Sequence, residues 1–85
     1  MIQMYGLAVK QRKILLVEDD PLVAFRQAAL LRNNGYEVVQ SESGEKAVML
    51  CRDNPDIGLV LMDIELGEGM DGAETARHIL RHRDV

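Results

Sequence analysis

Cysteine and aromatic residues are scarce in this chain, which has one cysteine, Cys51, no tryptophan and only 4% aromatic residues. A single cysteine excludes an internal disulfide and fits a reducing compartment, so we expect a cytoplasmic protein. No apolar run approaches the roughly 20 residues of a membrane helix, and we expect no membrane contact. Few aromatics and an acidic balance, 10 Lys+Arg against 14 Asp+Glu, argue against direct nucleic-acid binding.

The chain has 85 residues, 47% of them hydrophobic and 28% charged, which are ordinary values for one small globular domain. Short apolar runs at residues 14–17, 36–40 and 57–62 predict three strands. The first and third runs have no polar alternation, which is typical of strands that are buried on both faces of a parallel sheet. Residues 1–12 show no clear period, and we interpret them as an N-terminal leader.

Helix signals follow each predicted strand. Asp20 and Pro21 open one helix, as the N-cap and the first helical residue, and Gly35 is the expected stop. A second helix begins near Ser43, and a third begins at Asp71, which starts a capping-box pattern. The resulting β-α-β-α-β-α order predicts an α/β fold with a doubly wound parallel sheet.

Acidic residues stand directly after two of the predicted strands. Right-handed crossovers and a strand order of 2-1-3 place the first strand in the centre, with a crevice at the carboxyl ends of the first and third strands. Glu18, Asp19 and Asp63 occupy those ends, so their carboxylates should converge. Such a cluster repels itself unless a proton or a cation neutralises it, and an open all-oxygen site suits Mg²⁺. An accessible carboxylate beside the cation could accept a phosphoryl group.

These residues resemble the receiver domains of two-component response regulators. Residues 14–21 are similar to the first strand and acidic pair of that family, residues 60–64 to its third strand, and residues 70–72 to the end of the following loop. The resemblance covers residues 13–85 and implies a flavodoxin-like receiver fold. Only the first three βα units would be present, so residues 13–85 would form a partial receiver, truncated before the fourth strand.

The resemblance also implies roles for individual residues. Asp63 would accept a phosphoryl group from a phosphohistidine of a sensor histidine kinase or a histidine phosphotransfer protein. Glu18, Asp19 and Asp63 would hold Mg²⁺ together with the backbone carbonyl of Glu65. The domain would then be a regulatory phosphoacceptor that modifies itself, and not an enzyme in the ordinary sense.

The sequence departs from the family pattern in two places. The loop at residues 66–69 is longer than usual, and the fourth and fifth strands, which carry a Ser or Thr and a Lys that bind the phosphoryl group, cannot be assigned. Lys46 lies in the second predicted helix and does not replace that Lys. The alternative is therefore a receiver-like fragment that binds a partner without phosphotransfer.

Other interpretations fit less well. Asp63, Glu65 and Glu74 match three positions of an EF-hand loop, but Glu68 stands where that loop needs glycine. An aspartyl-phosphate hydrolase would need a cap and further motifs that 85 residues cannot hold.

The third predicted strand should be an unprotected edge. Residues 57–62 carry no charge and no proline, and no fourth strand is available to pair with them. We therefore expect self-association through this exposed strand, as an edge-paired or swapped dimer, or else aggregation.

Overall fold

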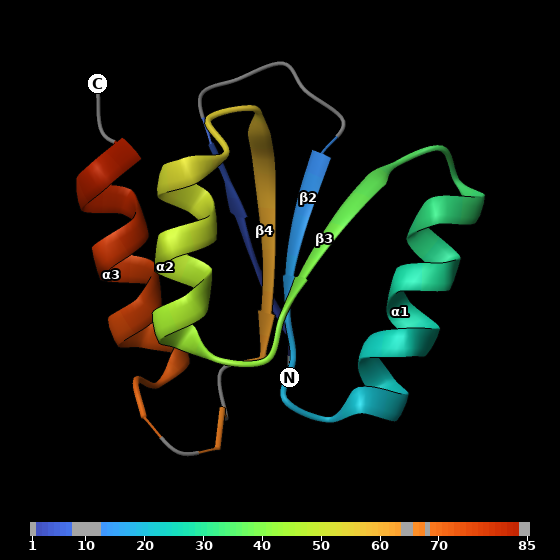
Figure 1. Cartoon of the computed structure of the whole chain (residues 1–85), viewed down its shortest axis with the longest axis horizontal. Coiled ribbons are helices and arrows are strands. Elements are labelled where there is room, and N and C mark those ends of the chain that lie inside the picture. The colour runs from blue at the N-terminus through green and yellow to red at the C-terminus, as the bar shows by residue number, and fades with distance from the viewer. Residues whose placement is uncertain (1, 8–12, 64–65, 68, 84–85) are drawn as a thin grey trace.

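A computed structural model shows a mixed four-stranded sheet with helices on both faces (Figure 1). The structure describes residues 2–7, 13–63, 66–67 and 69–83. Among them, no helix is long and apolar enough to cross a bilayer. The elements in chain order are β1 (Ile2–Gly6), β2 (Lys13–Val17), α1 (Pro21–Asn33), β3 (Glu37–Ser41), α2 (Gly44–Asp53), β4 (Ile57–Asp63) and α3 (Gly72–Arg83).

The strand order in the sheet is β1-β4-β2-β3. The three predicted strands are adjacent and parallel, with β2 in the centre, as the crossover argument requires. In this register Val17 lies beside Met62, so the carboxyl ends of β2 and β4 are level with each other. That alignment determines where the acidic residues that follow the two strands meet.

The three helices begin where their capping residues predict. The Asp20 carboxylate accepts a hydrogen bond from the Leu22 amide at 2.9 Å, and Asp71 accepts one from the Glu74 amide at 2.8 Å. Gly35 follows α1 with a φ of 89°, which is the left-handed stop expected there. Helix α1 packs on one face of the sheet, and α2 and α3 lie together on the other face (Figure 1).

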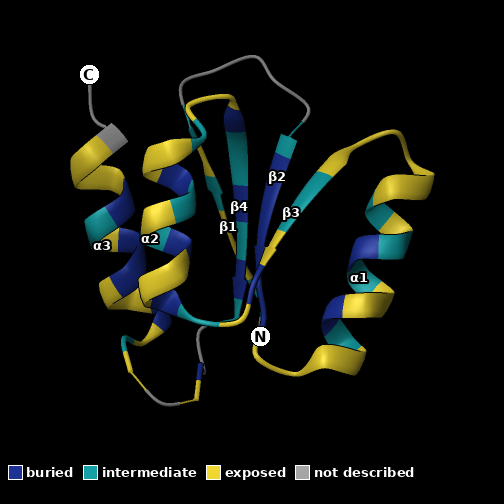
Figure 2. Ribbon diagram, in the orientation of Figure 1, coloured by how far each residue is buried: buried dark blue, intermediate teal, exposed yellow. Residues whose placement is uncertain are grey.

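The main core lies between the sheet and the α2–α3 pair, where β2, much of β4 and the inner helix surfaces are buried (Figure 2). The opposite face is covered less completely, because α1 packs mainly on β2 and β3. Leu59 and Leu61 of β4 point to this side and are only half-buried. The buried core cluster consists of Leu15, Val17, Ala47, Cys51, Ile57, Val60, Met62, Leu66, Ala76 and Ile79.

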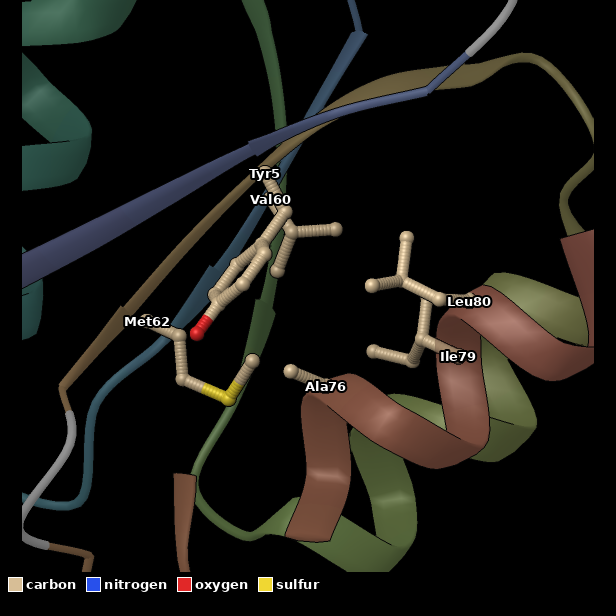
Figure 3. Close-up of a pocket in the computed structure, with 6 residues that line it drawn as sticks. All are labelled: Tyr5, Val60, Met62, Ala76, Ile79 and Leu80. Carbon is tan, nitrogen blue, oxygen red and sulfur yellow. The ribbon is translucent and has the colours of Figure 1, made fainter. Parts of the chain in front are cut away.

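The expectation of a purely parallel three-stranded sheet with β4 at its edge is wrong. Residues 2–6, part of the segment interpreted as a leader, form β1 and pair with β4 in the antiparallel direction. The Tyr5 ring points with Val60 and Met62 toward Ala76 and the neighbouring residues of α3, which anchors β1 to the core (Figure 3). Because β1 covers the outer side of β4, residues 57–62 are not the exposed edge on which the expected self-association was based.

Candidate functional site

The candidate site lies where the apolar runs of β2 and β4 give way to acidic residues. Asp63 is the last residue of β4, and Glu18 follows β2 directly. The Glu18 amide donates a hydrogen bond to the Ser41 carbonyl at 3.0 Å, which continues the β2–β3 ladder by one residue. This bond keeps Glu18 in line with the central strand and directs its side chain into a buried position, with 7% of its surface exposed.

The sequence prediction that three carboxylates converge is confirmed. Glu18, Asp19 and Asp63 each offer a carboxylate oxygen, and these oxygens lie within 4.8 Å of one another. Octahedral Mg²⁺ binds oxygens at about 2.0–2.1 Å, so its ligands are at most about 4.2 Å apart. Side-chain adjustments smaller than about 1 Å would bring the three oxygens onto one ion. In size and in donor chemistry the cluster therefore fits Mg²⁺.

The three acids differ in their surroundings. Glu18 is buried, Asp63 is half-buried and Asp19 is exposed. Burial raises the pKa of Glu18, and the neighbouring charges of Asp63 and Asp19 raise it further. A hydrogen bond of 3.1 Å from the Asp20 amide to the Glu18 carboxylate opposes this shift in part. A nearby cation would therefore favour the charged form of Glu18.

In the described part of the chain, the basic side chains that form ion pairs do so with acidic residues outside this cluster. Lys13 pairs with Asp56 at the opposite end of β2, and Lys46 pairs with Glu42 at 3.5 Å. Lys46 is half-exposed, and its ion pair is with Glu42, four residues before it in the chain.

Two acidic side chains hold the loop that follows β4. The Oδ2 atom of Asp19 accepts a hydrogen bond from the Gly67 amide at 2.9 Å. Glu45 of α2 accepts one from the Met70 amide at 3.0 Å, and Gly69, with a φ of 90°, lets the chain pass close to that carboxylate. Asp19 therefore links the acidic cluster to the loop, and Glu45 fixes the far end of the same loop.

The loop contacts of Glu45 and Gly67 were not predicted from the sequence. Glu45 is in the first turn of α2, where an acidic residue is adequately explained by the helix dipole. Gly67 donates through its backbone amide, a group that the side-chain types in a sequence do not mark. The predicted contribution of the Glu65 carbonyl lies outside the described residues.

A pocket of about 310 Å³ opens beside the acidic cluster, between the carboxyl ends of β2 and β3 and the start of α1. It gives solvent access to Glu18 and Asp19 from that side. Its lining residues are Glu18, Asp19, Pro21, Ala24, Gln40, Ser41 and Glu42.

Comparison with known proteins places this geometry in a family. The family model described as "Response regulator receiver domain" matches residues 14–85. The chain is 34% identical over 74 residues to protein PilH of Pseudomonas aeruginosa, covering 86% of this chain and 59% of PilH. It is 41% identical over 69 residues to the CAI-1 autoinducer sensor kinase/phosphatase CqsS of Vibrio cholerae, covering 81% of this chain and 10% of CqsS.

A solved structure shows the same likeness in three dimensions. The N-terminal domain of a response regulator/sensory box/GGDEF three-domain protein from Carboxydothermus hydrogenoformans superposes with a TM-score of 0.74 at 41% identity. The match covers 86% of this chain and 58% of that solved N-terminal domain, and the chain likewise spans only part of the curated relatives, 59% of PilH and 10% of CqsS. The sequence and the fold agree, and the chain belongs to the response regulator receiver domain family of two-component signalling.

Proposed function

We propose that this chain is a Mg²⁺-dependent phosphoacceptor in which Asp63 receives a phosphoryl group. The observation that carries the proposal is the convergence of Glu18, Asp19 and Asp63 at the carboxyl ends of two adjacent parallel strands. Residues 13–85 would make up the receiver portion. The regulatory character of the family supports self-modification in place of turnover of a separate substrate.

The three acids would divide the chemistry among them. Glu18 and Asp19 would hold Mg²⁺ with Asp63, and the Glu65 carbonyl would add a further ligand. When bound, Mg²⁺ would offset the negative charges of the carboxylates and of the incoming phosphoryl oxygens. Asp19 would keep its Oδ2 on the Gly67 amide while its other oxygen faces the ion. Its orientation would then be fixed before the ion arrives.

Asp63 would act as the nucleophile. One carboxylate oxygen of Asp63 would form a bond to phosphorus as the P–N bond to a donor imidazole breaks. The donor ring, protonated at its other nitrogen, would take the electron pair of that bond and leave as neutral imidazole, and Asp63 would become an acyl phosphate. The half-exposed position of Asp63 supports this role, because a protein donor must reach it from solvent.

The proposed donor is a phosphohistidine of a histidine kinase or a histidine phosphotransfer protein. The likeness of the chain to part of a sensor kinase, CqsS, supports a partner of this kind. Incubation with a purified, radiolabelled phosphohistidine donor and Mg²⁺ should move the label to the wild-type chain and not to Asp63→Asn. Failure of both wild-type and variant chains to take up label would favour the alternative, a partner-binding receiver without phosphotransfer.

The metal half of the proposal has its own test. A Mg²⁺ titration followed by NMR should give saturable shifts of the amide signals of residues 18, 19 and 63. Asp19→Asn and Asp63→Asn should abolish these shifts. Asp56→Asn is the matched control, because Asp56 pairs with Lys13 at the other end of β2. If both site variants titrate like wild type, Mg²⁺ binds somewhere else.

A further inference from the structure

The outer edge of β1 offers hydrogen-bonding groups that no described residue is seen to pair with. The Leu7 amide donates to the Gly58 carbonyl at 2.9 Å, which makes these two residues a hydrogen-bonded pair of the antiparallel ladder. Because such pairs alternate with non-hydrogen-bonded ones, Tyr5 and Gln3 also direct their backbone groups toward β4. Met4 and Gly6 therefore direct their amide and carbonyl groups away from the sheet.

We propose that two copies of this chain associate through β1, antiparallel, about a two-fold axis at Met4. In this register Met4 faces Met4 of the second copy, and Ile2 faces Gly6. All of these are residues whose backbone groups point outward, so each pair can exchange two hydrogen bonds. The edge is thus complementary to itself, which a symmetric dimer requires. The two four-stranded sheets would become one continuous sheet of eight strands.

An apolar row on the α1 side of the sheet continues into the proposed contact. Leu16 of β2 lies beside Leu61 of β4, which in turn lies beside Met4 of β1. Exposure increases along this row, from 1% at Leu16 through a half-buried Leu61 to 68% at Met4. In the dimer the two Met4 side chains would cover each other, and the row would run through both copies.

The two edges of the sheet are protected very differently. The β3 edge carries the exposed charge of Glu37, and Arg32 of α1 donates to the Val38 carbonyl at 3.2 Å. Residues 2–6 of β1 contain no charge and no proline, and a Cβ added at Gly6 would meet open space. Charges and prolines are the usual protection of edge strands, and residues 2–6 of β1 contain neither.

A second copy of the chain fits this edge because no two like charges would face each other across the paired strands. The contact would be smaller than a standard interface, so the dimer should be weak, with a dissociation constant on the order of 10–100 μM. Because the two copies run antiparallel, their acidic clusters would lie at opposite ends of the joined sheet. Association and phosphoryl transfer would therefore be compatible.

Sedimentation equilibrium of the full chain from about 5 to 500 μM tests the proposal and should show a monomer–dimer equilibrium. Met4→Pro removes an outward amide that β4 does not use, so the fold should persist while the dissociation constant rises at least about tenfold. Met4→Ala keeps the amide and is the matched control, which should still dimerise. A strictly monomeric wild type, or a Met4→Pro chain that dimerises like wild type, would overturn the proposal.

A second variant decides the matter if Met4→Pro does not fold. Met4→Lys places two like charges next to each other across the axis, so the chain should be monomeric at low salt and regain part of its dimerisation at high salt. Isotope-filtered NMR of wild type should also show contact between the α-protons of Gln3 in one copy and Tyr5 in the other, which form a non-hydrogen-bonded pair in this register. A dimer without that contact would contradict the proposed register.

Discussion

Removal of one charge from the acidic cluster should stabilise the metal-free protein. Asp63→Asn keeps the shape of the side chain and removes its negative charge. Two unit charges 4.8 Å apart repel each other by about 3.5 kcal/mol at an effective dielectric constant near 20, and by about 0.9 kcal/mol at that of water. Asp63 has two such neighbours, the buried Glu18 and the exposed Asp19, and the second pair belongs nearer the lower value.

The net gain should be smaller than the sum of the two repulsions. Replacing a carboxylate oxygen with an amide nitrogen also disturbs hydrogen bonds around residue 63, with a loss of about 1 kcal/mol. We therefore expect Asp63→Asn to raise the free energy of unfolding by about 1–3 kcal/mol at pH 7 in low salt with a chelator. In a domain of this size that corresponds to a rise in Tm of at least about 4 °C.

Urea unfolding monitored by circular dichroism measures this difference. Saturating Mg²⁺ should cancel or reverse the gain, because the cation neutralises the cluster in wild type. Acid should shrink the gain, because carboxylates become protonated. Asp53→Asn changes the net charge equally at an exposed residue that pairs with Arg52, and it should shift stability by less than about 0.5 kcal/mol. An unchanged or less stable Asp63→Asn chain at pH 7 without metal would refute the electrostatic reasoning.

Three further predictions concern single residues. Because the pKa of Glu18 is raised in the folded state, the folded protein holds this proton more tightly than the unfolded chain does. The wild type should therefore lose stability as the pH rises from about 4.5 through that raised pKa. Urea unfolding of Glu18→Gln, repeated over the same pH range, should lack this loss. Gly44→Ala should lower the free energy of unfolding by about 1–3 kcal/mol, because a Cβ there collides with the Thr75 hydroxyl, and Thr75→Ala in the same chain should restore part of the loss. Glu45→Ala should speed hydrogen exchange of the Met70 amide, whose acceptor it removes, and unchanged exchange would show that Glu45 does not hold the loop.

The parallel part of the fold could be predicted because its signals are local. The apolar runs of β2 and β4 stop abruptly at acids, and the caps Asp20 and Asp71 mark helix starts by their own hydrogen bonds. The handedness of crossovers then brings Glu18 and Asp63 together without any knowledge of side-chain contacts.

The N-terminal strand could not be predicted because its stabilisation is not local. Residues 2–6 are too few to show a convincing period, and β1 forms because β4 offers an open edge and α3 offers a surface for Tyr5. The inward face of α1 also depends on packing against the sheet. The small residues Ala24 and Ala28 face the sheet, and the larger Leu30 is 64% exposed. The helix therefore packs on the sheet through small side chains and not through its larger apolar ones.

Site-mapped phosphorylation tests the central claim most directly. The full chain is incubated with a small acyl-phosphate donor, with Mg²⁺ or with a chelator, and the product is examined by intact mass and by peptide mapping. We predict the slow addition of one phosphoryl group, located on Asp63, that requires Mg²⁺ and is lost in both Asp63→Asn and Asp19→Asn. A phosphoryl group on another residue, or the same yield on Asp63 in the presence of the chelator, would contradict the account.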